Sequence, residues 1–132
     1  MRALTIHQPW AWLIAEGIKD IENRRWETKY RGPLLIHSGK SRRSMKNGLS
    51  FANMAPGAVA VPDAYHLKFG KIIAVVELVD IVQNDASYWA ESGCFNWKLS
   101  NAKRLDDPID CRGHMGLFDP PENIMKKIKE QL

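Results

Sequence analysis

Apolar residues near the start of the chain predict a strand followed by a helix. The short apolar run Ala3–Ile6 is typical of a strand. Trp10, Leu13 and Ile14 then recur at helical spacing, which predicts an amphipathic helix. Gly17 follows this stripe, and glycine adopts the left-handed conformation at a helix end more easily than any other residue. We therefore expect Gly17 to have a positive φ and to end the helix.

The longest apolar run lies in the middle of the chain, within Lys71–Gln83. Its residues from Ile72 to Val76 are apolar without interruption, and continuous runs are typical of strands buried on both faces. We expect Ile72–Val82 to form a central strand. Three shorter segments are also predicted as strands: Leu34–His37, Trp97–Ala102 and Cys111–Phe118.

The polar residues of two further segments predict their structure. The segment 38–70 is the least regular, and we expect a helical turn and a long basic loop there. Near the end, Asp119 is predicted to cap a last helix that has Pro120 at its first position. The order of strand, helix, several strands and helix predicts an α+β fold with a curled, barrel-like sheet, formed by one domain over residues 1–132.

The charge of the chain favours an anionic partner. Lys and Arg total 19 against 15 acidic residues, a net charge of +4. Such an excess favours nucleic acid because each neutralised phosphate releases counterions, although a basic surface without a partner has the same composition. Cys94 and Cys111 are expected to be free thiols, and no apolar stretch is long enough to span a bilayer. We expect a cytoplasmic monomer.

A charged segment with the pattern G-x-K-x-x-E-x-R runs from Gly17 to Arg24. Lys19 offers a movable ammonium and Arg24 a planar fork suited to phosphate. Glu22 can accept from the amine of a base, or pair with either cation. In an ideal strand Lys19 would face away from Glu22 and Arg24, so their convergence needs a bend near Asp20. The alternative is a solvated ion network.

This segment and its surroundings resemble the ASCH domain, named for activating signal cointegrator homology, of the PUA-like superfamily. The resemblance also rests on flanking segments: Ile6-His7-Gln8-Pro9-Trp10-Ala11, Tyr30-Arg31-Gly32-Pro33-Leu34-Leu35-Ile36-His37, 70–80, 97–102 and Arg112-Gly113. It implies a PUA-like curled mixed or antiparallel β-sheet flanked by short helices. It also implies a cleft beside the helix-to-strand turn and binding of RNA; some members are linked to RNA cleavage, and a subset to amide hydrolysis on acylated cytidine.

The resemblance also implies catalytic candidates. In the amide-hydrolase branch, the lysine of the pattern works with a strand glutamate and a threonine. Lys19 and Glu77 match two of these positions, and Glu22 stands where the threonine would be. We take Lys19, Glu22 and Glu77 as catalytic candidates, although the missing threonine is a departure from that branch.

Several other residues are candidates for contact with nucleic acid. Trp26 and Trp97 could stack on a base, or pack in the core instead. Flanking polar residues could reach the cleft, or form ordinary turn hydrogen bonds: His7, Gln8, Arg31 and His37. Arg42 and Arg43, in a basic cluster with Lys40 and Lys46, could contact phosphates outside the cleft, or be solvated.

No metal or cofactor is expected. Cys111 and His114 have ligand-like spacing, but no second cluster completes a zinc site. The sequence also lacks a P-loop, a G-x-G-x-x-G loop and a nucleophile elbow. Three hypotheses remain: a module that binds single-stranded RNA or a nucleotide, an enzyme of the same fold (a ribonuclease or a nucleoside-directed amide hydrolase), and a protein-interaction adaptor with an inert cleft.

Overall fold

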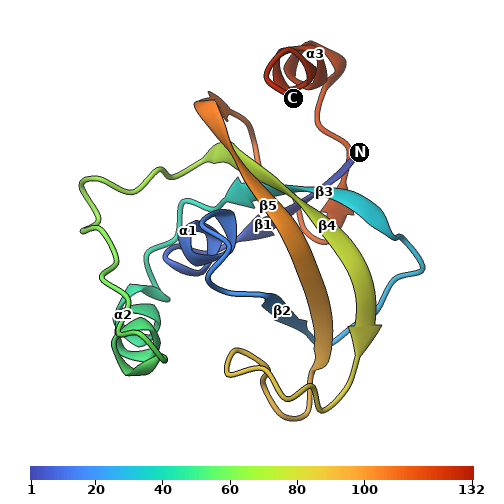
Figure 1. Cartoon of the computed structure of the whole chain (residues 1–132). Helices are drawn as coiled ribbons and strands as arrows, with labels where there is room; N and C mark the ends of the chain where they lie inside the picture. The colour runs from blue at the N-terminus through green and yellow to red at the C-terminus, as the bar shows by residue number, and fades with distance from the viewer.

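The computed structural model describes all 132 residues and contains one six-stranded sheet with the order β2-β5-β4-β3-β1-β6. The strands are β1 (Arg2–Ile6), β2 (Ile21–Arg24), β3 (Gly32–Ser38), β4 (Lys71–Val82), β5 (Phe95–Asp110) and β6 (Leu117–Phe118). The helices are α1 (Trp10–Ala15), α2 (Met45–Met54) and α3 (Glu122–Lys129). β1 and β3 are parallel and the other pairs antiparallel, so the sheet is mixed. It curls around α1, as Figure 1 shows, and the predicted α+β fold is confirmed.

The strand β4 lies between β5 and β3, and the prediction of a central strand is confirmed. Ile72, Ala74 and Val76 are buried to 1% exposure or less. The continuous apolar run is explained by the two cores that the curled sheet covers, one on each face. β4 contributes Ala74 and Val76 to one core and Ile72 to the other.

The two cores are covered by different helices. α1 packs its buried Ala11 and Ile14 against the larger core, together with Leu4, Ile36 and Trp97. On the other side of the sheet, α3 contributes Ile128 to the smaller core. Both chain ends lie beside α3 in Figure 1.

Gly17 ends the first helical segment as expected. Its φ is +74°, and its N–H donates to Ile14 O at 3.0 Å. The next two N–H groups, of Ile18 and Lys19, both donate to Leu13 O at 3.0 Å. These bonds satisfy carbonyls at the end of α1 and turn the chain directly toward β2.

Several sequence predictions about the strands and the last helix are wrong. β5 continues to Asp110, well past the predicted end at Ala102, because its second half pairs with the first half of β4. Within Cys111–Phe118 only the last two residues are a strand. Asp119 does not cap α3, because it pairs with Arg2 at 2.9 Å and the helix begins at Glu122.

The segment 38–70 contains the ten-residue helix α2 where only a helical turn was expected. Because Gly48 has no side chain, α2 can lie close to Pro9 at the start of α1. A side-chain carbon at Gly48 would lie 2.3 Å from Pro9 Cγ, so only glycine fits there. None of the three helices is long and apolar enough to cross a membrane.

Candidate functional site

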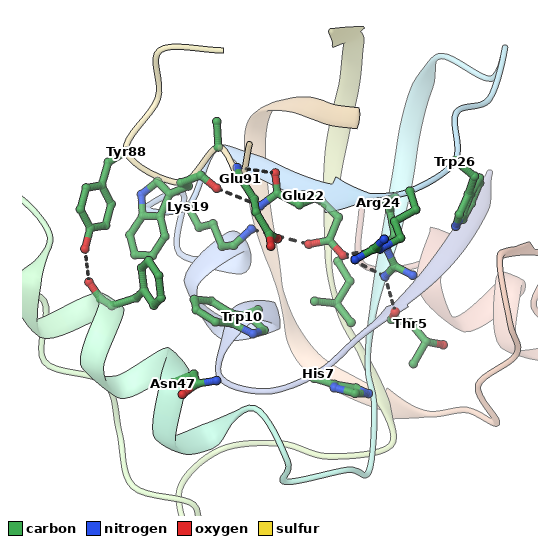
Figure 2. A pocket seen from close by; sticks show the side chains of 16 residues that line it. Thr5, His7, Trp10, Lys19, Glu22, Arg24, Trp26, Asn47, Tyr88 and Glu91 are labelled. Carbon is green, nitrogen blue, oxygen red and sulfur yellow. Dashed lines mark hydrogen bonds and ion pairs between the residues drawn. The ribbon is translucent and has the colours of Figure 1, made fainter. Parts of the chain in front are cut away.

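A cleft of about 860 Å³ lies at the free edge of β2. Its walls come from four places along the chain: the end of β1, the start of α1, the helix α2, and the loop 88–91 between β4 and β5. Figure 2 shows that side chains from all four converge on the charged segment of β2. A cavity of this volume is within the usual range for sites of small molecules.

A row of three charged side chains crosses the cleft. Glu22 lies in the middle, 3.6 Å from Lys19 Nζ and 2.8 Å from Arg24 Nη2. The second contact is supported by Arg24 Nε, which donates to the same carboxylate oxygen at 2.9 Å. The row forms because β2 begins only at Ile21, so Lys19 precedes the strand and is free to turn toward Glu22. The bend that convergence required is therefore present.

Lys19 is unusually buried for a lysine, with 5% of its surface exposed. Burial lowers the pKa of its ammonium, and the neighbouring Glu22 carboxylate opposes that shift. Lys19 Nζ also donates to Ile21 O and lies 5.7 Å from the centre of the Trp10 ring. The ammonium is thus held by a carboxylate, a carbonyl and an aromatic face.

Aromatic rings form one wall of the cleft. Trp10 contacts Phe51 and Trp89 edge to face, with centroid separations of 5.9 Å and 6.4 Å. Tyr88 contacts Trp89 at 5.0 Å, and its hydroxyl donates to Phe51 O at 2.8 Å. This hydrogen bond joins the 88–91 loop to α2. Trp26 lies at the opposite end of the charged row, beyond Arg24 (Figure 2).

Asn23 attaches the aromatic loop to the edge of β2. Its Nδ2 donates to Trp89 O at 2.9 Å, and its Oδ1 accepts from Glu91 N at 3.0 Å. Asn96 Nδ2 donates to the same oxygen at 2.9 Å and fixes the Asn23 amide from the neighbouring strand. Consecutive residues of the charged segment therefore supply the polar row and hold the aromatic wall.

The pattern of the ASCH domain family matches residues 4–109, most of the chain. The chain belongs to the ASCH domain family. Members of this family are generally thought to bind RNA. Activating signal cointegrator 1 of Homo sapiens is 54% identical over 33 residues, 25% of this chain, and its Mus musculus counterpart is 49% identical over 41 residues, 31% of this chain. These matches span only 6% and 7% of the relatives' own lengths.

Two crystal structures, an ASCH protein from Zymomonas mobilis and a mutant of it, share the fold of this ASCH domain. Their TM-scores are 0.62 and 0.61, and each is 14% identical to this chain. The likeness covers 98% of this chain and 93% and 96% of theirs. At this identity the likeness concerns the fold alone, in agreement with a PUA-like curled sheet.

Five of the predicted site residues line the cleft of this ASCH domain: His7, Lys19, Glu22, Arg24 and Trp26. The imidazole of His7 lies at the foot of the cleft, with its Nδ1 3.1 Å from Ser44 Oγ. Burial lowers the pKa of His7, and the nearby Arg43 and Arg24 lower it further. A neutral His7 is therefore favoured next to the two guanidinium groups.

Other predicted residues lie away from the cleft. The side chain of Gln8 forms hydrogen bonds within the fold. Its Nε2 donates to Lys68 O and its Oε1 accepts from Trp12 N, each at 2.8 Å. Arg31 binds Thr28 O at 2.7 Å and lies outside the cleft. Arg42 and Arg43 precede α2 and do not line the cleft, as expected for residues outside it.

Two sequence predictions need correction. Trp97 cannot stack on a base because it is fully buried, and its Nε1 donates to Trp26 O at 3.3 Å. Glu77 does not join Lys19, because it lies on β4 opposite Ser100 and lines no part of the cleft. Catalysis by a Lys19–Glu77 pair is therefore not supported by the geometry.

The aromatic wall is the part of the site that sequence reasoning missed. Tyr88 and Trp89 follow Asp85 and Ser87 in a polar loop, and an aromatic pair in such a loop was the available signal. Phe51 gave a weaker signal as a single aromatic residue in an irregular segment. No group of three or more His, Cys, Asp or Glu residues is arranged to hold a metal ion.

Proposed function

We propose that this ASCH domain binds single-stranded RNA, with one nucleotide held in the cleft. The observation that carries the proposal is the presence in one cavity of a charged row, buried at Lys19 and Glu22, and an aromatic wall. Bases of single strands stack on aromatic rings, and their edges are read by hydrogen bonds. The RNA binding generally attributed to the family supports the same class of ligand.

The charged row suits a base edge or a phosphate in different ways. Glu22 accepts only, so its carboxylate favours a base that presents an amine. Arg24 keeps 23% of its side chain exposed and can donate to a carbonyl or a phosphate oxygen. The rings of Trp10 and Trp89 are partly exposed in the wall and can contact the face of the base.

A titration of short RNA oligomers tests the proposal. Trp89→Ala should weaken binding by about 1–3 kcal/mol, the usual contribution of one stacked base. Tyr65→Ala is the matched control, because Tyr65 is 89% exposed and does not line the cleft. Glu22→Gln should change which base is preferred, since an amide also donates. Equal affinity of the Trp89 and Tyr65 variants would exclude the cleft as the binding site.

Hydrolysis in the same cleft is a second candidate function, and the state of Lys19 favours it. A buried lysine with a lowered pKa beside a carboxylate is the kind of group that acts as a general base or acid. Glu22 rather than Glu77 would then be its partner. The test incubates the protein with RNA and with an acylated cytidine: product that the parent forms and Lys19→Met does not would identify an enzyme. Absence of product from both substrates would exclude this hydrolysis and leave RNA binding as the proposed function.

A further inference from the structure

A second cavity, of about 750 Å³, shares only Thr5 with the cleft described above. Its basic wall is formed by Lys40, Arg112 and His114. Its acidic residue, Asp110, is already bound to Lys71 at 2.7 Å. No ion pair of the structure involves Lys40 or Arg112. Two cations therefore line the cavity without a carboxylate partner.

Backbone donors add to this positive surface. The segment Arg112–Met115 lines the cavity, and none of its N–H groups donates a hydrogen bond within the chain. The segment packs tightly against the residues beneath it, because a side-chain carbon at Gly113 would lie 2.8 Å from His37 Cε1. Successive backbone N–H groups without an acceptor, next to cations, form the kind of concave surface that binds phosphate.

His37 holds this segment in place. Its Nε2 donates to Cys111 O at 2.6 Å, and its Nδ1 accepts from Thr5 Oγ1 at 3.1 Å. Burial lowers the pKa of His37, so the neutral ring required by these two bonds is favoured. The predicted contact of His37 with the cleft is thus replaced by a contact with the wall of the second cavity.

The two cavities adjoin at β1. Thr5 lines both: its carbonyl accepts from Arg24 Nη2 at 2.8 Å on the cleft side, and its hydroxyl bonds His37 on the other. Gly39, in the second cavity, lies against the cleft residue His7, since a side-chain carbon there would be 3.6 Å from His7 Cδ2. Thr5 of β1 is therefore the residue at which the two cavities meet.

We infer that the second cavity binds the phosphodiester backbone of the nucleotides that adjoin the one in the cleft. The ligand is then a single-stranded oligonucleotide rather than a mononucleotide. This inference rests on the proposed function of the cleft and extends it to a path of several nucleotides across β1. Arg112, Lys40 and the N–H groups of Arg112–Met115 contact phosphates, while the cleft contacts a base.

The test measures the affinity of cytidine, cytidine monophosphate and oligocytidylates of two, four and eight residues at several salt concentrations, because cytosine presents an amine to Glu22. Affinity should rise with length up to the span of both cavities. Arg112→Gln should weaken the octamer about fivefold at 0.1 M salt and reduce the salt slope by about 0.7, the effect of one phosphate contact on a single strand. Arg112→Gln should leave cytidine binding unchanged. Lys103→Gln removes one exposed charge of β5 outside both cavities and is the control.

Three outcomes would overturn the inference, and they distinguish its failure from that of the proposed function. If Trp89→Ala weakens every ligand while Arg112→Gln behaves as Lys103→Gln, the cleft binds a nucleotide and the second cavity has no part. If Trp89→Ala changes nothing, the proposed function of the cleft fails as well. Amide resonances provide a readout on the unmodified protein: those of Arg112–Met115 should shift with the tetranucleotide and not with cytidine. Unshifted amides with a bound tetranucleotide would also refute the inference.

Discussion

Replacing Glu22 with glutamine isolates the energetic role of the charged row. The substitution keeps the size of the side chain and removes the counter-ion from Lys19. Only 5% of the Lys19 surface is exposed, so water cannot replace the missing carboxylate. Arg24, in contrast, is partly exposed and still donates to Thr5 O, so it can adjust more easily. The expected result is a strong loss of stability caused mainly by an uncompensated buried ammonium.

The magnitude follows from the geometry. Two unit charges 3.6 Å apart attract by about 4.6 kcal/mol at an effective dielectric constant of about 20. The amide oxygen of glutamine recovers part of this as a dipole. We therefore expect Glu22→Gln to lower the free energy of unfolding by about 3–4 kcal/mol, within the range of about 3–5 kcal/mol for breaking a buried pair. The double variant Lys19→Met/Glu22→Gln should recover at least half of the lost free energy of unfolding, because it no longer contains the buried Lys19 ammonium.

Urea unfolding followed by tryptophan fluorescence measures these changes in stability. Repeating the measurement at several pH values tests whether the buried Lys19 ammonium causes them. Burial already lowers the pKa of Lys19, and removing Glu22 removes the largest influence that raises it. A lysine with a lower pKa in the folded state binds fewer protons there than when unfolded, so stability rises as pH increases toward the unfolded value near 10.4. The deficit of Glu22→Gln should therefore shrink between pH 7 and pH 9.5.

Glu27→Gln is the matched control, since Glu27 is exposed and takes part in no ion pair. Its effect should stay within about 0.5 kcal/mol. A loss below about 1 kcal/mol for Glu22→Gln, or a double variant less stable than either single one, would refute the reasoning. The charged row would then be a solvated network of little energetic importance.

Two further predictions concern stability. Gly17→Ala should cost about 1–2 kcal/mol in urea unfolding, because its φ is +74°. The nearest atom to an added side-chain carbon, Ala102 Cβ, is 3.9 Å away, so no clash adds to that cost. The folded state should also lose stability as pH falls below about 6.5, because burial lowers the pKa of His37 and protonation then favours the unfolded chain. That loss should be smaller in His37→Gln, and an identical pH profile would contradict the assignment.

The sequence predicted those parts of the fold that depend on local pattern. A continuous apolar run identified β4, and a glycine after a helical stripe identified the end of α1. β5 was truncated in the prediction because its second half, through Asp106, Asp107 and Pro108, is polar and exposed on much of its surface. Its strand conformation depends on pairing with β4, a partner that no local pattern reveals.

Burial of the tryptophans could not be assigned from composition either. Trp26 and Trp97 have similar polar neighbours in the sequence, yet Trp26 is 36% exposed and Trp97 is fully buried. The difference arises because Trp97, near the start of β5, has a strand partner on each side, Glu22 of β2 and Ile81 of β4, and belongs to the larger core. Trp26 follows the end of β2 and makes a T-shaped contact with Trp97, at a centroid separation of 4.9 Å.

The polar strand β2 can belong to the sheet because it lies at the edge of the sheet. An edge strand leaves a row of backbone groups without a strand partner, and these must be covered or solvated. Here Lys19 Nζ binds Ile21 O, while Asn23 binds the loop that carries Tyr88 and Trp89. The groups that cover the edge are thus the same groups that build the cleft. Asn23 occupies an unspecified position of the G-x-K-x-x-E-x-R pattern, so its role follows only from the path of a loop more than 60 residues further along the chain.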